Sequence, residues 1–308
     1  MEGIKFGIEL EMCCNKNYTV MNNLFKQHDI NWSVVKDGSI MCKGTDRFGN
    51  KLQTMENYGK INNNGKKYGI EIVSPVLSNI SDIEIFLGKL YSLGTYLDIN
   101  QTHGFHVHMS LPWFQKEHFV SSPLGKKLAM SICINWIAFE KYIYSLFPTI
   151  KQRIPHSRTM ESNVRYIKKV NEVSGLNVNK LYSYQYMAST FNPKRGDFGP
   201  KKVYPPGPYH EVGLIRGRNS SVNLFNLNPN ASNRKGTIEF RHHNGTLKKD
   251  DIVCFVRFLY SFFHSCYNSS TNRFVDAREL IKTYTKKSYK NCSVKELETV
   301  FKKYFIKV

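Results

Sequence analysis

Three short segments, far apart in the chain, share a pattern in which apolar residues alternate with side chains that bind metal ions. They are Phe6–Glu11 (FGIELE), Gly104–Ser110 (GFHVHMS) and Thr237–Arg241 (TIEFR). Successive side chains of a strand point to opposite faces, so each segment predicts a strand with one apolar face and one polar face. The polar faces carry Glu9 and Glu11, then His106, His108 and Ser110, then Glu239 and Arg241.

If the three strands belong to one sheet, these polar faces form a floor that needs a cation. Carboxylates packed together repel one another and lose their hydration. A divalent ion relieves both costs, and a carboxylate-rich ligand set favours Mg²⁺ or Mn²⁺. A lone Glu-x-Glu strand is usually a solvated sheet face, and a lone His-x-His can be a hydrogen-bonded pair at a sheet edge. The metal-site hypothesis therefore depends on the three strands occurring together.

The remaining composition is that of a globular protein. Hydrophobic residues make up 41% and charged residues 22% of the chain, as in soluble domains. Its 308 residues allow one large domain or two ordinary ones. The longest apolar stretches, Leu128–Phe139 and Ile252–His264, fall short of the roughly 20 residues of a membrane span. No signal peptide is expected, because the chain opens directly into its first strand.

The cysteines indicate a reducing, cytoplasmic location. They number 7, an odd count, and they show no C-x-x-C pair or other zinc spacing. We therefore expect Cys13, Cys14 and the others to behave as small apolar residues.

Positive charge is concentrated in the second part of the chain. Residues 1–120 hold 12 basic and 12 acidic residues, so the net charge of +20 lies in residues 121–308. Such a surface attracts ATP, acidic peptides, nucleic acid or an anionic membrane. Coding bias is the alternative, since the chain is rich in Lys, Asn, Ile and Tyr, as an AT-rich genome would encode. Both explanations stay open at this point.

Local signals predict the other elements. Trp32–Val35 reads as a strand entering a hairpin at Asp37-Gly38, and Tyr68–Pro75 as a strand with Glu71 on its polar face. Ser81 is expected to cap a helix that runs to Leu97. Further helices are predicted at Val20–Gln27, Leu124–Leu146, Thr159–Val173, Asp250–Tyr267 and within Asp276–Val308, and a strand pair at Ser221–Leu227 and Thr237–His242.

Two segments read as long loops. Lys43–Lys67 is rich in Gly, Asn and Lys and predicts an exposed insertion or a long hairpin. Thr190–Arg218 is rich in Pro, Gly and basic residues, which suits either a lid over phosphates or a solvated loop.

Five motifs in sequence order resemble those of the amidoligase family, a branch of the carboxylate–amine ligases that includes glutamine synthetase and glutamate–cysteine ligase. The resemblance implies an α+β fold: a curved, mostly antiparallel sheet of the glutamine synthetase type, with helices packed on its outer face. It implies a catalytic domain at 1–270, with 271–308 as a basic helical extension packed on the same domain. The motifs are FGIELE at 6–11, DGSI at 37–40, GIEIVSP at 69–75, HGFHVHMS at 103–110 and GTIEFRHHNGTL at 236–247.

The resemblance also implies a metal and nucleotide site. Two or three Mg²⁺ ions, or Mn²⁺, would lie between ATP and the acceptor. The implied metal ligands are Glu9, Glu11, Glu71, His106 and Glu239.

Other residues receive roles from the same resemblance. Arg241 would contact phosphate, His108 and Ser110 would lie near the nucleotide or acceptor, and Asp37 would border the amine site and accept its proton. Arg216 or Arg218 would bind phosphate, with a surface salt bridge as the alternative. His243 faces the site if strand alternation continues, although a structural hydrogen bond is its expected role.

The implied function is an ATP- and Mg²⁺-dependent ligase that forms an amide or isopeptide bond through an acyl phosphate. A carboxylate is a poor electrophile, so the γ-phosphate of ATP would activate it before an amine displaces phosphate. Its partners would be a carboxylate donor, such as a glutamyl or aspartyl group, and an amine acceptor, either a small molecule or a peptide. The alternative is a catalytically retired ligase fold whose basic half binds nucleic acid or an acidic protein. The oligomeric state is not predicted.

Overall fold

The strand β1 (Lys5–Cys14) is the centre of an 8-stranded sheet in this computed structural model. It pairs with β4 (Tyr68–Val73) on one side and with β6 (Gly104–Ser110) on the other, and its end also pairs with β5 (Leu97–Asn100). Every pairing between the described strands is antiparallel. The other strands of the sheet are β2 (Ser33–Lys36), β3 (Thr54–Tyr58), β7 (Val222–Asn223) and β8 (Ile238–Asn244), and β9 (Tyr267–Asn268) pairs separately with β10 (Arg273–Phe274).

The structure describes residues 3–45, 51–60, 66–111, 114, 123–147, 221–223, 225–227, 235–268, 273–274 and 277–305. The predicted helix Thr159–Val173, the loop Thr190–Arg218, and the candidate phosphate ligands Arg216 and Arg218 lie outside these residues.

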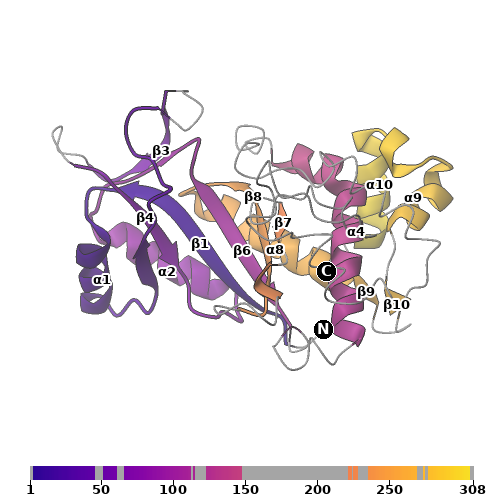
Figure 1. The fold of residues 1–308 in the computed structure, drawn as a ribbon, viewed down its shortest axis with the longest axis horizontal. Coiled ribbons are helices and arrows are strands. Elements are labelled where there is room, and N and C mark those ends of the chain that lie inside the picture. Colours follow the sequence, from indigo (N-terminus) through magenta and orange to yellow (C-terminus); the bar gives the residue numbers. More distant parts are fainter. Residues whose placement is uncertain are drawn as a thin grey trace, which may run out of the picture.

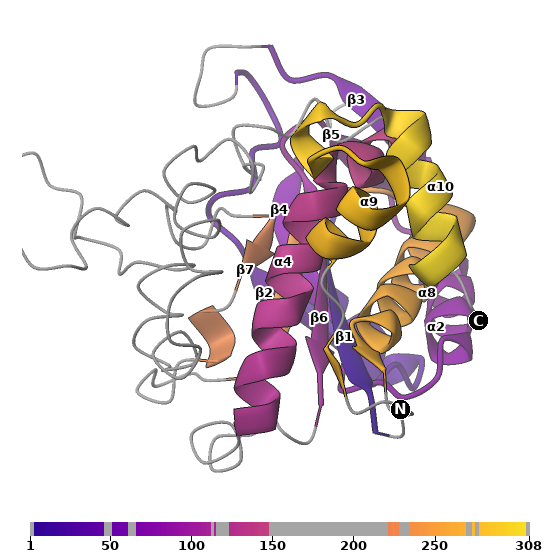
Figure 2. The same ribbon diagram turned by 90° about the vertical axis from the view of Figure 1, so that its right-hand side faces the viewer.

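The helices pack against the apolar face of the sheet, opposite the face that carries Glu9 and Glu11. Trp32, next to β2, stacks on Phe86 of α2 with ring centroids 3.5 Å apart. At the other end, Trp136 of α4 lies 5.0 Å from Phe240 of β8. Figures 1 and 2 show how the helices are arranged around the sheet. The helices are α1 (Tyr18–Gln27), α2 (Ser81–Ser92), α4 (Pro123–Leu146), α8 (Lys249–Ser265), α9 (Ala277–Thr285) and α10 (Val294–Phe305), with short 3-10 turns η6 (Phe225–Leu227) and η7 (Tyr289–Asn291).

The class of fold agrees with the prediction: helices combine with an antiparallel sheet that does not close on itself. The alternation of β1 predicted its buried face, since Phe6, Ile8 and Leu10 are buried in the core. Figure 2 looks onto α4 with α8, α9 and α10 beside it. Among the described residues, no helix has the length and apolarity that crossing a membrane requires.

The Asp37-Gly38 turn does not form the predicted hairpin. β2 pairs with β4, while the next strand along the chain, β3, pairs with β5. The Asp37 carboxylate instead accepts a hydrogen bond from the Ser39 amide at 2.7 Å, which closes a local turn of the kind that competes with hairpin formation. The segment Lys43–Lys67, predicted as an exposed insertion or a long hairpin, contributes β3 to the sheet, and most residues of this strand are exposed.

The helix predicted from Ser81 to Leu97 is shorter than expected. It ends at Ser92, and no side chain caps its start. Gly94 follows with a φ of 62°, a left-handed conformation that stops a helix and that glycine adopts without strain. The chain then turns into β5, Leu97–Asn100, where no strand was predicted and of which the predicted helix included only Leu97.

Candidate metal centre

The register of the sheet brings the predicted ligands together on its polar face. β4, β1, β6 and β8 are neighbours in that order, so side chains from four strands converge. Alternation alone predicted which face each side chain occupies, and the register now places them directly opposite one another. The cross-strand pairs are Glu11 with Glu71, Glu9 with His106, and His108 with Glu239.

Glu9 lies at the centre of this cluster. One of its carboxylate oxygens, Oε1, is 3.0 Å from His108 Nε2 and 2.6 Å from Lys235 Nζ. The other, Oε2, is 3.4 Å from His106 Nδ1. Glu9 is only 7% exposed, so these three groups replace the water that a carboxylate otherwise needs.

His106 connects three carboxylates at the floor of the site. Besides its contact with Glu9, its Nε2 lies 3.5 Å from Glu11 Oε1 and its Nδ1 lies 3.7 Å from Glu239 Oε1. The imidazole is 1% exposed. A buried imidazole between several carboxylates can act as a cation, when it is protonated, or as a metal ligand, when it is neutral. Both roles need the carboxylates of the neighbouring strands to lie within reach, which the register of the sheet provides.

Glu239 is neutralised by groups of the chain itself. Its Oε1 pairs with the Arg241 guanidinium, and its Oε2 accepts a hydrogen bond from Asn223 Nδ2 at 2.8 Å. Burial raises the pKa of Glu239, but Arg241 first, and then His108 and His106, outweigh burial and hold that pKa at about 2. Glu239 is therefore ionised at neutral pH.

Charge is less well balanced on the β4 side of the site. Burial would raise the pKa of Glu9, but His106 and His108 outweigh it and keep this pKa well below its ordinary value. Glu71 has weaker support, because the charge of Lys235 lowers its pKa but does not outweigh the opposing effects. Burial, followed by the negative charges of Glu9, Glu11 and Asp37, raises the pKa of Glu71 to about 8. The cluster thus carries more negative charge near Glu71 than its own cations neutralise.

Three overlapping groups of side chains on this face each bring ligand atoms within 4.8 Å of one another. All of them combine carboxylate oxygens, in two cases with an imidazole nitrogen, which is the donor chemistry that Mg²⁺ and Mn²⁺ accept. The groups are Glu9, Glu71 and His106; Glu9, His108 and Glu239; and Glu11, Asp37 and Glu71.

The structure adds two residues that the sequence analysis missed. Lys235 approaches Glu9, and Asn223 donates to Glu239. Lys235 stands just before the third polar strand in the sequence, and this position beside a carboxylate-bearing strand could have predicted its contact with the site. Nothing in the sequence could have predicted the role of Asn223, because its contact depends on β7 pairing with β8. Ser110, predicted to lie near the nucleotide, donates to the backbone oxygen of Gly236 at 2.8 Å.

His243 does not face the site as alternation predicted. The register between β6 and β8 shifts after Val107, so that Phe105 lies opposite His243 while Val107 lies opposite Phe240. A bulge of this kind adds one residue and reverses the alternation beyond it. The His243 ring consequently packs 4.8 Å from that of Phe255, on the helix side, and its Nδ1 lies 2.7 Å from the Asn244 oxygen.

The expectation for the cysteines is wrong at one pair. Cys13 and Cys42 form a disulfide across a sequence separation of 29. The spacing of the two residues in the sequence did not predict this bond. Cys42 comes close to Cys13 only because the chain after β2 crosses β4 beside the end of β1. The expectation holds for buried free thiols elsewhere, at Cys14, Cys133, Cys266 and Cys292.

We expect Mg²⁺ binding to release a proton from Glu71. With a pKa of about 8, this carboxyl group is protonated at pH 7 in the metal-free protein and must deprotonate to bind a cation. Mg²⁺ affinity should therefore rise with pH up to about 8 and then level off. Calorimetry in two buffers of different ionisation enthalpy should count about one proton released per protein at pH 7 and almost none at pH 9.

The free energy of unfolding of the metal-free protein should fall as pH rises, which is opposite to the trend expected for Mg²⁺ affinity. The folded, metal-free protein keeps the Glu71 proton between the ordinary pKa of 4.5 and about 8, so this group makes folding less favourable as pH rises through that window. Glu71→Gln should remove both pH dependences, and Glu84→Gln, at a partly exposed position on α2, should preserve them. Proton release that is unchanged in Glu71→Gln would contradict the assignment.

A family model described as "putative amidoligase enzyme" matches residues 2–263. The match begins just before β1 and ends within α8, so it contains every residue of the cluster around Glu9. No curated protein matches the chain.

Proposed function

The chain belongs to this amidoligase family, and we propose that it is an ATP- and Mg²⁺-dependent ligase that joins a carboxylate to an amine. The observation that best supports this function is the surplus of buried carboxylate between β1 and β4. A pKa of about 8 at Glu71 means that the site pays an electrostatic cost which a divalent cation would relieve. Such a cost is expected where a cation belongs to the working state.

The donor set fits hard divalent cations. Oxygen ligands predominate, the imidazoles lie among them, and the ammonium of Lys235 at 2.6 Å from Glu9 is the kind of positive charge that this cluster attracts. When bound, Mg²⁺ would neutralise the charge on a phosphoryl group during its transfer. The residues that would hold it are Glu9, Glu11, Glu71, His106 and Glu239.

The residues at the edge of the cluster would act on the substrates. Arg241 and Lys235 carry positive charge to the site and would contact the phosphates of ATP. ATP would phosphorylate the donor carboxylate, and the amine would then attack this acyl phosphate and expel phosphate. Asp37, whose carboxylate lies in the same ligand group as Glu11 and Glu71, would accept the proton of the incoming amine. His108 would orient the donor beside Glu9.

Calorimetric titration of ATP, with and without Mg²⁺, tests this function. We expect wild-type protein to bind ATP only when Mg²⁺ is present. The variant Glu9→Gln/Glu239→Gln should bind at least about 100-fold more weakly, because two carboxylates around the ions are neutralised. Glu298→Gln removes a partly exposed carboxylate on α10 and should bind like wild type.

Two outcomes would count against the ligase. One is ATP binding that ignores Mg²⁺, and the other is binding that persists in the double variant. A folded wild-type protein that binds no ATP would favour the second candidate, a retired ligase fold that binds nucleic acid.

One feature of the C-terminal helices favours that second candidate. The ammonium of Lys303 lies 4.9 Å from the ring centroid of Tyr284 and 5.3 Å from that of Tyr304, and both rings are exposed. Exposed aromatic rings beside basic side chains suit stacking on single-stranded nucleic acid. Salt-sensitive binding of random-sequence DNA that survives in Glu9→Gln/Glu239→Gln would identify this activity.

A further inference from the structure

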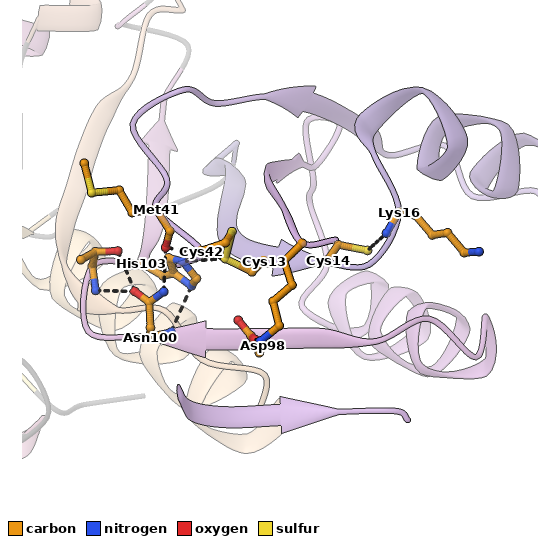
Figure 3. Close-up of a disulfide and its surroundings, with 10 residues drawn as sticks. Cys13, Cys14, Lys16, Met41, Cys42, Asp98, Asn100 and His103 are labelled. Carbon is orange, nitrogen blue, oxygen red and sulfur yellow. Dashed lines mark hydrogen bonds and ion pairs between the residues drawn. A yellow bond between two sulfur atoms is a disulfide. The ribbon is translucent and has the colours of Figure 1, made fainter. Parts of the chain in front are cut away.

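The disulfide between Cys13 and Cys42 joins two parts of the candidate site. Cys13 follows Glu11 by two positions on β1, and Cys42 ends a short stretch, residues 37–42, that begins with Asp37. We call this stretch the Asp37 segment. Figure 3 shows the disulfide with Met41, Asn100 and His103 gathered to one side of it. The covalent bond therefore links the strand that carries two candidate ligands to the segment that carries a third.

The Asp37 segment is attached to the sheet at three places. The backbone of Ile40 crosses β4 so closely that a Cβ at Gly69 would lie 2.7 Å from the Ile40 oxygen. The Met41 oxygen accepts a hydrogen bond from Asn100 Nδ2 at 2.8 Å. The disulfide at Cys42 is the third attachment. Asp37 itself follows Lys36, the last residue of β2, by a peptide bond, so within the described part of the chain the disulfide is the covalent attachment at the far end of the segment.

Electrostatics oppose this placement of the segment. The Asp37 carboxylate lies within 4.8 Å of ligand oxygens of Glu11 and Glu71, and two carboxylates at this distance repel each other when both are ionised, as Asp37 and Glu11 would be. Its own hydrogen bond goes to Ser39 inside the segment and does not tie it to the sheet. Without a cation, the disulfide thus holds the segment against a repulsive force.

The two sulfur atoms differ in their access to solvent. Cys13 is completely buried, whereas Cys42 is partly exposed. Four other cysteines remain buried free thiols inside a large apolar core. A disulfide that is reachable from solvent and attached to the site is suited to a local role.

His103 favours thiol chemistry over metal binding at this pair. Its Nδ1 accepts a hydrogen bond from the Asn100 amide at 3.2 Å, so the ring proton lies on Nε2, which is 3.4 Å from Cys13 Sγ. A protonated Nε2 can donate to sulfur, but it offers no lone pair to a metal. Gly245 approaches this residue so closely that a Cβ there would lie 2.8 Å from the His103 Cβ.

We propose that the Cys13–Cys42 disulfide is a reversible redox switch that holds or releases the Asp37 segment. The thiolate of a small-molecule thiol attacks the accessible Cys42 sulfur and forms a mixed disulfide. The electron pair of the broken bond goes to Cys13, beside the Nε2–H of His103, and this sulfur takes up a proton from solvent. A second thiolate then attacks the small molecule's sulfur and releases Cys42. Two small-molecule thiols are thereby oxidised to one disulfide, and the protein gains two electrons and two protons.

Release of the segment removes Asp37 from Glu11 and Glu71. In the reduced protein one of the three ligand groups is incomplete, so divalent ions should bind more weakly. This expected loss of affinity for divalent ions rests on the proposed function. The release of the segment on reduction does not depend on that function.

Hydrogen exchange and Mn²⁺ binding on the protein of residues 1–308, oxidised and then reduced with dithiothreitol, test the switch. Alkylation should count five free thiols before reduction and seven after it. Amides of residues 37–42 should exchange at least about 10-fold faster after reduction, and Mn²⁺ affinity, measured by electron paramagnetic resonance, should fall by about 10-fold. Reoxidation should restore both values.

Two variants sharpen the test. Cys42→Ser should behave as the reduced protein with or without dithiothreitol. Cys254→Ser removes an exposed free thiol on α8 and should respond like wild type. Because the main comparison uses chemically reduced wild type, it stands even if Cys42→Ser fails to fold.

The result that overturns the switch is a cleaved disulfide with unchanged exchange in residues 37–42. Stoichiometric Zn²⁺ binding by the reduced protein, lost in Cys42→Ser, would overturn it in favour of a metal site at Cys13, Cys42 and His103. If the oxidised protein binds no Mn²⁺, the proposed function fails, while faster exchange in residues 37–42 on reduction would still support the switch.

Discussion

Replacement of Glu239 with glutamine should destabilise the metal-free protein by about 3 kcal/mol. The Glu239 carboxylate pairs with the Arg241 guanidinium, and the two side chains are only 5% and 14% exposed. The substitution leaves a mostly buried cation without its nearest carboxylate, so its lost hydration is no longer compensated. Because the pKa of Glu239 is lowered to about 2, this contribution is complete at neutral pH and lost only as pH falls through that value.

Urea unfolding at pH 7 in the presence of a chelator measures the effect. A double-mutant cycle with Arg241→Met isolates the pair, since Glu239→Gln/Arg241→Met removes both charges. We expect the double variant to lose less stability than the sum of the single variants, with an interaction of at least about 1 kcal/mol. Additive losses would show that Arg241 is not the counter-ion of Glu239 and would leave phosphate contact as its main role.

Strand alternation is why the sequence predicted so much of the site. Within each strand, the face that a side chain occupies follows from a period of two, which is a local property of a short segment. This period groups the polar residues of each strand: Glu9 with Glu11, His106 with His108, and Glu239 with Arg241. Their burial and convergence required only that the segments join one sheet. The register of β1 against β4 and β6 then placed the predicted residues in direct cross-strand pairs.

The features that escaped prediction depend on contacts between distant parts of the chain. The bulge that turns His243 toward the helices appears only in the pairing of β6 with β8. The contact of Lys235 with Glu9 spans 226 positions, and the Cys13–Cys42 bond spans 29. β3 lies in the segment predicted as an exposed insertion or a long hairpin from its Gly-, Asn- and Lys-rich composition, and its pairing with β5 decides its structure. No local pattern encodes such contacts.

Phe301→Ala should lower the free energy of unfolding by about 3–5 kcal/mol, although residue 301 lies beyond the matched family segment of residues 2–263. Phe301 is 1% exposed. Its ring centroid is 5.0 Å from that of Phe139 on α4 and 5.7 Å from that of Phe258 on α8. The last helix therefore completes the core around α4. The same helix α4 contacts β8, because Trp136 packs against Phe240.

We expect Phe301→Ala to unfold in a single transition, with the same midpoint for every probe and at a lower denaturant concentration than wild type. Near-ultraviolet circular dichroism, which reports the aromatic core, and loss of Mn²⁺ binding, which reports the site, should shift together in Phe301→Ala. Tyr304→Ala, at an exposed position of the same helix, should change stability by less than about 0.5 kcal/mol. If the two signals separate, with the Mn²⁺ site unaffected, residues 271–308 form an independent unit. If they coincide, the helical extension predicted to pack on the catalytic domain is part of its cooperative core, and truncation at residue 270 would unfold the site.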